Sequence, residues 1–296
     1  YHHDDGTLEK VTIGGDTITD ATNTLIFNSS STGIYQFNGN GVIVGVIDGV
    51  FDVYHPDFRT AAGITRVLFL WDQNLIPQGT EVSPPIAPAL PGFTPNGGTT
   101  YGVEYSQADI TTELNNFNPP ITPAYQTVRH APGPPPNNAN TGHGTFVTGC
   151  AAGNGLGQAS TFVGAAPGAN IIFVSNRGTP GIALFADNTF VWDAFSYIFA
   201  RAAVLGQPCV INMSASDNQG PHDGTTLGEQ FLDGLLLTPG RAITLSAGNS
   251  NGTASHATGN VAAGGTTNLI INYALPPAPQ THRSDDIEIW YDGHDR

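Results

Sequence analysis

Four short apolar runs, rich in β-branched residues, constrain the fold more than any other feature of the sequence. They cover Gly41–Ile47, Ala169–Ser175, Pro208–Ser214 and Arg241–Ser246. Continuous apolar character, in place of strict alternation, is typical of strands that are buried on both faces, as in parallel sheets. We therefore expect these four runs to be central strands of one sheet.

Segments with helical periodicity lie between the last three runs. Apolar residues recur three and four positions apart in 188–205 and again in 225–237. Strands that alternate with helices predict an α/β fold, built as a doubly wound parallel sheet. Right-handed crossovers then place helices on both faces of that sheet.

Composition excludes several classes of protein. Hydrophobic residues make up 39% of the 296 residues, enough for the sizeable core of one large domain. With 24 acidic residues against 9 lysines and arginines, the net charge of -15 argues against binding to nucleic acid. The apolar runs are too short for a membrane span. Cys150 and Cys209 lie in apolar stretches, where we expect buried free thiols, with a disulfide between them as the alternative.

Two stretches depart from the alternating pattern. Residues 74–136 are crowded with Pro, Gly, Asn and Thr, and we interpret them as a surface insertion with one helical segment at Ser106–Asn115. In the tail, Leu269–Ile271 and Ile287–Tyr291 have the character of antiparallel strands that begin a β-rich insertion. One incomplete domain is thus divided into an N-terminal segment with the first strand, the Pro/Gly-rich insertion, the continued core and the start of the second insertion, at 1–73, 74–136, 137–265 and 266–296.

An aspartate and a histidine stand at positions that suit catalysis. Asp48 directly follows the first run, and catalytic groups of open α/β sheets gather at the carboxyl ends of strands. His143 lies between two glycines where a loop leads into a helix of small residues, which allows close packing. Alone, such an aspartate could form a turn and such a histidine could be structural. Together they predict that a carboxylate from the first strand reaches the imidazole.

These segments resemble a known family in their order along the chain. Asp48-Gly-Val with the following His-Pro-Asp-Phe, Gly142-His143-Gly-Thr and Gly164-Ala-Ala-Pro-Gly-Ala-Asn170 are similar to successive blocks of the subtilisin-like serine proteases, the subtilases. Met213-Ser-Ala-Ser and Ser246-Ala-Gly-Asn resemble that family's substrate-pairing strand and oxyanion block. The similarity runs from about residue 39 to residue 252. Two further segments, 65–72 and 220–225, resemble a branch that contains spore-germination subtilases.

The resemblance implies a serine endopeptidase and assigns a role to each matched residue. His143 would be the general base and acid, Asp48 would orient it, and Asn249 would donate to the oxyanion. Backbone groups of three residues would pair with an extended peptide, namely Ser214, Ala215 and Ser216. Ala215 and Ser216 replace the family's usual leucine and glycine, and Phe146 replaces a common histidine. The family implies no cofactor for catalysis and a structural calcium ion, whose ligands the sequence does not identify.

The family's serine block, Gly-Thr-Ser followed by small residues and proline, is not found in the sequence. The nearest candidate, Gly248-Asn-Ser250-Asn-Gly252, fits a nucleophile elbow, but in that class of hydrolase the serine precedes its acid and histidine. We therefore expect the serine to lie downstream of Arg296, on a C-terminal fragment of the same precursor that stays bound to this chain. The resemblance further implies a secreted or cell-surface enzyme that processes itself at both ends, with Tyr1 left by removal of a propeptide.

Two other functions stay open. The chain could be a catalytically inactive subtilase-fold scaffold or a peptide-binding regulator, although the retained aspartate, histidine and asparagine argue against this. It could also be a metal-dependent hydrolase that uses His143 with Asp48, or the N-terminal His2-His3-Asp4-Asp5 run. No His-x-x-x-His pair supports that class.

Overall fold

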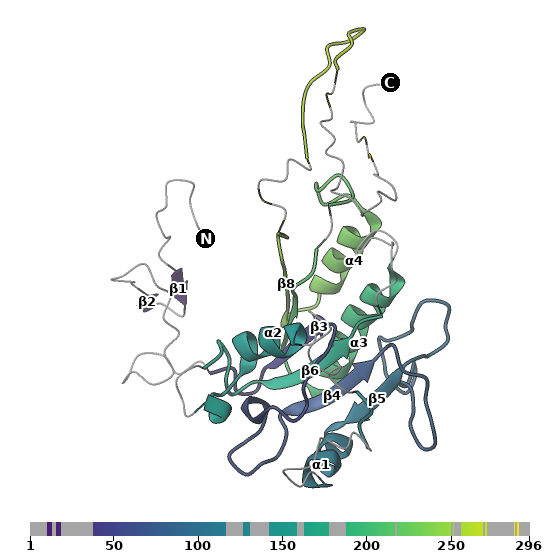
Figure 1. Ribbon diagram of the computed structural model, residues 1–296. Helices are drawn as coiled ribbons and strands as arrows, with labels where there is room; N and C mark the ends of the chain where they lie inside the picture. Colours follow the sequence, from purple (N-terminus) through teal and green to yellow (C-terminus); the bar gives the residue numbers. More distant parts are fainter. Residues whose placement is uncertain are drawn as a thin grey trace, which may run out of the picture.

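The computed structural model describes residues 11–13, 16–18, 38–116, 127–130, 142–158, 163–177, 188–216, 218–249, 251, 256–268, 270, 287 and 289. Six strands form one sheet in the order β5-β4-β6-β3-β7-β8 (Figure 1). Five of them run parallel, and β5 is antiparallel to β4. The bounds are β3 (Ile43–Asp48), β4 (Val67–Asp72), β5 (Val103–Ser106), β6 (Asn170–Ser175), β7 (Cys209–Met213) and β8 (Arg241–Leu245). A separate antiparallel pair consists of β1 (Val11–Ile13) and β2 (Asp16–Ile18).

The predicted α/β sheet is confirmed. The four apolar runs form β3, β6, β7 and β8, which are neighbours in the order above. Strands β6, β3 and β7 are central as expected, whereas β8 is at the edge of the described sheet. In β3 the first five residues are buried, which agrees with a strand covered on both faces. The segment of β4 was recognised only by its resemblance to a family branch, and it adds a further parallel strand beside β6.

Helices cover both faces of this sheet, as the alternation predicted (Figure 1). The bounds of the α-helices are α1 (Gln107–Asn116), α2 (His143–Ala152), α3 (Thr189–Leu205) and α4 (Leu227–Leu236). One apolar cluster contains Ile43 and Ile47 of β3 together with side chains of α3 and α4. The other contains Val44 and Val46 of β3 together with side chains of α1 and α2. Alternate residues of one strand thus belong to two separate cores.

The ends of α3 and α4 follow from local sequence. The Asn188 side chain accepts a hydrogen bond from Phe190 N at the start of α3, and Gly206 ends that helix in a left-handed conformation. Thr226 and Glu229 form a reciprocal capping box at the start of α4. These caps explain why the two predicted helices begin and end within a few residues of the expected positions.

The structure corrects the interpretation of residues 74–136 as a surface insertion. The predicted helical segment is present as α1, shifted by one residue, but β5 in the same stretch is a strand of the main sheet. Its Val103 and Tyr105 are buried in the core that α1 and α2 share. The segment of this stretch that forms β5 and α1 is therefore integral to the fold.

Two further expectations concern the tail and the thiols. The predicted strands Leu269–Ile271 and Ile287–Tyr291 lie largely outside the described residues, and the described positions within them are not in strands. Both cysteines are free thiols; Cys209 is buried as expected, whereas Cys150 is exposed. Among the described residues, no helix has the length and apolar character needed to cross a membrane.

Candidate active site

Asp48 and His143 meet at the carboxyl edge of the sheet. Asp48 is the last residue of β3, and His143 is the first residue of α2. His143 Nδ1 lies 2.9 Å from both Asp48 Oδ1 and Asp48 Oδ2. Asp48 Oδ1 also accepts a hydrogen bond from the backbone N–H of Gly49 at 2.7 Å, which fixes the carboxylate. The predicted pairing of these two residues is confirmed.

The exposure of the two side chains differs in a way that suits proton transfer. Only 7% of the Asp48 side chain is exposed, whereas 49% of the His143 side chain is. Since the carboxylate accepts from Nδ1, the neutral imidazole carries its proton there and keeps a lone pair on Nε2. None of the described residues hydrogen-bonds that nitrogen. The arrangement can accept a proton from a group that approaches from solvent.

Close packing of α2 against β3 sets this geometry. A Cβ atom at Gly144 would lie 2.5 Å from the carbonyl oxygen of Val50 and 3.3 Å from Asp48 Cβ. Only glycine therefore allows the first turn of α2 to approach the loop that follows Asp48. The neighbouring histidine is brought within hydrogen-bond distance as a result.

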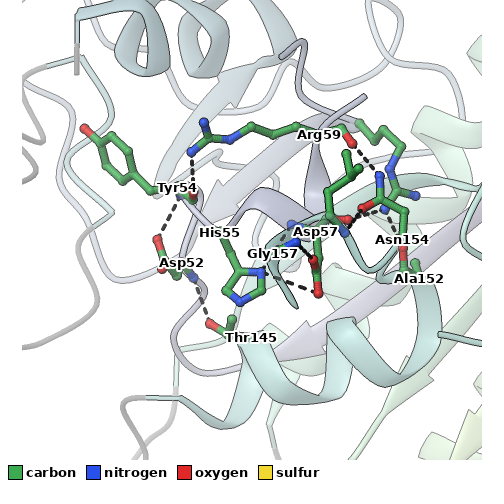
Figure 2. A network of polar contacts seen from close by, with 11 residues as sticks. Asp52, Tyr54, His55, Asp57, Arg59, Thr145, Ala152, Asn154 and Gly157 are labelled. Carbon is green, nitrogen blue, oxygen red and sulfur yellow. Dashed lines mark hydrogen bonds and ion pairs between the residues drawn. The ribbon is translucent and has the colours of Figure 1, made fainter. Parts of the chain in front are cut away.

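A network of polar contacts holds the loop between β3 and the short 3₁₀ helix η1 (Pro56–Phe58) (Figure 2). The backbone N–H of Asp52 donates to Thr145 Oγ1 at 2.9 Å, so the loop is bonded to the helix that carries His143. Asp57 Oδ1 accepts from Gly157 N at 2.5 Å, and Asn154 N donates to Asp57 O at 3.1 Å. The start and the end of α2 are thereby both tied to the segment that follows β3.

The other predicted site residues lie at the carboxyl ends of β7 and β8. Backbone N–H of Ser246 donates to Met213 O at 3.2 Å, which aligns the two ends. A Cβ atom at Gly248 would lie 2.6 Å from Ser216 Oγ, and Gly248 has a φ of +87°. The structure thus brings the segment Ser214, Ala215 and Ser216 together with the turn that presents Asn249, which is exposed. Their catalytic and substrate-binding roles stay predictions, and Ser250 lies outside the described residues.

A second histidine–aspartate pair was not predicted. His130 Nδ1 lies 2.6 Å from Asp72 Oδ2, and both residues are buried. Asp72 ends β4 as Asp48 ends β3, and this shared position after an apolar strand was the one signal in the sequence. His130 lies in the Pro/Gly-rich stretch, 58 residues from its partner, where no local pattern marks it.

The calcium expectation stays a prediction. Across the described parts of the chain, no three side chains of histidine, cysteine, aspartate or glutamate come close enough together to hold a metal ion. The run His2-His3-Asp4-Asp5 lies outside these residues. The Asp57 carboxylate binds the Gly157 amide, and the Arg66 guanidinium donates to the Asp57 carbonyl oxygen at 2.6 Å.

Comparisons with known proteins identify the family and agree with the fold. The model of the subtilase family matches residues 39–275. The solved structure of the CspB protease from Clostridium perfringens is similar, with a TM-score of 0.55 and 24% sequence identity. The likeness covers 74% of this chain but 38% of that protease, so the chain spans less than half of its length, and at this identity the likeness shows the fold alone. No curated protein sequence matches the chain.

Proposed function

The chain belongs to the subtilase family, and from this premise we propose that it supplies the acid, the base and the oxyanion donor of a serine endopeptidase. The observation that carries the proposal is the contact of His143 Nδ1 with both carboxylate oxygens of Asp48. It orients the imidazole and selects the tautomer with a lone pair on Nε2, while about half of the His143 side chain is exposed.

The proposed reaction uses each residue in turn. His143 Nε2 accepts the hydroxyl proton of a serine as the serine oxygen attacks the scissile carbonyl carbon. The Asn249 side chain donates a hydrogen bond to the resulting oxyanion. His143 then gives the proton to the leaving amine, the peptide bond breaks and an acyl-serine remains. Water, deprotonated by the same imidazole, hydrolyses the acyl-serine and returns the enzyme to its starting state.

The segment Ser214–Ser216 is the proposed platform for the substrate backbone. It continues β7 beyond Met213 and runs beside Gly248, next to the proposed oxyanion donor. An extended peptide that pairs with it would place its scissile carbonyl near Asn249. Ala215 is smaller than the leucine that it replaces, and Ser216 is larger than the glycine that it replaces. We therefore expect the preference for substrate side chains to differ from that of the family.

The nucleophile is proposed to come from a serine-bearing segment of the same precursor that stays bound to this chain. The exposure of β8 supports a bound segment. Three of the five residues of β8 are exposed, whereas the first five residues of β3 in the same sheet are buried. Exposed apolar side chains also occur in α4, in β8 and beyond them, and they include Leu227, Leu237, Leu245, Val261 and Ile270. Such a surface fits a further strand and its covering helices. Secretion, self-processing and calcium binding are proposals that follow from the family.

Peptide hydrolysis by the protein assembled with that segment tests the proposal. We expect His143→Ala to lower kcat by about 10⁶-fold, because it removes the base, and Asp48→Asn by about 10⁴-fold, because it removes the carboxylate that selects the tautomer. Ser250→Ala is the matched control, and it should leave kcat unchanged. Loss of activity in the Ser250 variant would identify the elbow serine as the nucleophile and overturn the proposed assembly.

The alternative is a peptide-binding regulator without catalysis. Wild type and the His143→Ala variant would then bind an extended peptide equally, and neither would release a cleavage product. A product formed by wild type and lost in the variant excludes that alternative.

A further inference from the structure

The buried pair of His130 and Asp72 repeats the geometry of the proposed catalytic pair on the neighbouring part of the sheet. Asp48 and Asp72 are both in register with Ser175 of β6, the strand that lies between β3 and β4. Each carboxylate contacts Nδ1 of a histidine. His143 is half exposed, whereas the His130 side chain is 3% exposed, so His130 cannot meet a substrate.

The second ring nitrogen of His130 has a definite partner. The buried backbone N–H of Phe51 donates to His130 Nε2 at 3.0 Å. That nitrogen must therefore hold a lone pair, and the proton of the neutral ring is on Nδ1, where it is donated to Asp72. Burial raises the pKa of Asp72, but hydrogen bonds from His130 and Asn74 outweigh it, so the net shift is downward and the carboxylate stays charged.

Phe51 is three residues beyond Asp48, in the loop that contacts the first turn of α2. The carbonyl oxygen of Val50 faces Gly144 so closely that it leaves no room for a Cβ atom. The next amide, that of Asp52, donates to Thr145 Oγ1 on the same helix. Two successive amides of this loop are thus fixed, one by His130 and one by the helix that carries His143.

His130 itself is held firmly by the residues on its N-terminal side. The buried Glu113 carboxylate of α1 accepts from the backbone N–H groups of Thr127 and Val128, at 2.6 and 3.2 Å. Arg129 forms an ion pair with Glu81 at 2.6 Å. The segment 127–130 is therefore anchored to Glu113 of α1 and to Glu81, and it can act as a rigid support for the His130 ring.

We propose that His130 is a positioning residue, which holds the loop after Asp48 through the Phe51 amide and so keeps His143 in contact with Asp48. The proposal rests on the proposed function only in taking that pair as the catalytic acid and base. Phe51 also packs its ring on Phe173 and Phe58, at centroid distances of 4.6 and 4.8 Å. The ring contacts hold the side chain, whereas the hydrogen bond to His130 fixes the orientation of the peptide group.

Nitrogen NMR of the chain with ¹⁵N-labelled histidine tests this without any assay of activity. At about pH 9, well above the ordinary histidine pKa of about 6.5, His143 should show one protonated and one lone-pair nitrogen, and His143→Ala assigns the signals. In His130→Leu, both nitrogens should move towards the averaged positions of an imidazole that exchanges between tautomers. His130→Gln keeps an acceptor for Phe51 and a donor for Asp72, and it should restore the wild-type positions.

Val191→Ala, which truncates a buried side chain on the opposite face of the sheet, controls for lost stability. Unchanged His143 signals in His130→Leu, or an equal shift in Val191→Ala, would overturn the proposal. Should His130→Leu fail to fold, Asp72→Asn removes the charged acceptor of the Nδ1 proton and loosens the ring, while the imidazole itself is retained. It should shift the His143 signals in the same direction, and no shift would contradict the proposal. Failure of the protease assays would leave this result intact, so the two proposals can fail separately.

Discussion

At the residue scale, the site depends on a few atoms that the fold brings together. The proposed base is oriented by one carboxylate, and the proposed oxyanion donor stands on a turn at the end of a different strand. The position of Asp48 at the end of an apolar strand marked it as a candidate in the sequence, whereas Asn249 was assigned by the resemblance of its segment to the family's oxyanion block. His130 could not be predicted, because both of its partners are distant in sequence, 58 and 79 residues away.

Alanine at position 249 tests whether Asn249 donates a hydrogen bond to the oxyanion. In the assembled protease, Asn249→Ala should lower kcat by about 10²–10³-fold and leave KM nearly unchanged, because the hydrogen bond forms only with the tetrahedral intermediate. Kinetics on a peptide substrate measure both constants. A rise in KM at constant kcat would instead place Asn249 in ground-state binding.

The Glu81 carboxylate gives a prediction about pH. Hydrogen bonds from Arg129 lead the contributions that lower its pKa from 4.5 to about 2. A lowered folded-state pKa stabilises the protein above about 4.5, and this stabilisation is lost as the pH falls towards 2. Glu81→Gln should therefore unfold more easily than wild type at pH 7, by about 1 kcal/mol. Urea unfolding at a series of pH values should show this difference narrowing below pH 4.5, whereas a constant difference would contradict the assignment.

At the element scale, the buried parallel strands and the helix α1 were predictable from local sequence, whereas β5 was not. Burial on both faces gives β3 and β6 continuous apolar sequences, which are recognisable without their neighbours. Strand β5 has four residues in a stretch rich in proline and glycine. Its stability comes from pairing with β4 and from Glu104, which forms an ion pair with Arg201 of α3. These are tertiary contacts that no local pattern reveals.

The close approach of α2 to β3 is testable with two substitutions on one helix. Gly144→Ala should destabilise the chain by about 1–3 kcal/mol, because the new methyl group meets a backbone carbonyl oxygen that cannot move freely. At Gly149, where nothing lies within 4 Å of the added atom, alanine should stabilise by up to about 1 kcal/mol. Denaturant unfolding compares the free energies of unfolding of the two variants. Equal changes would show that helix propensity alone, and not the contact with β3, determines the effect of alanine.

At the scale of the whole molecule, the two edge strands of the sheet, β5 and β8, differ in how far the described residues cover them (Figure 1). In β5, the backbone of Glu104 bridges to Val82 and its side chain binds the arginine of α3, whereas three of the five residues of β8 are exposed. An unprotected edge next to apolar surface favours association with another strand. We therefore predict that the serine-bearing segment is added at β8.

Hydrogen exchange tests that boundary. In the chain alone, amides of β8 should exchange much faster than those of β3, and in the assembled protease β8 should become protected. The protection of β3 should change little and serves as the internal control. If β8 were equally exposed in both forms, the proposed place of assembly would be wrong.

The central claim is that Asp48 and His143 activate a serine that this sequence does not contain. Labelling of the assembled protease with a fluorophosphonate probe, followed by mass mapping of the modified residue, tests it most directly. The account predicts one modified serine outside residues 1–296, with labelling lost in His143→Ala. A label on a serine within these residues, or labelling that persists in the variant, would contradict the account.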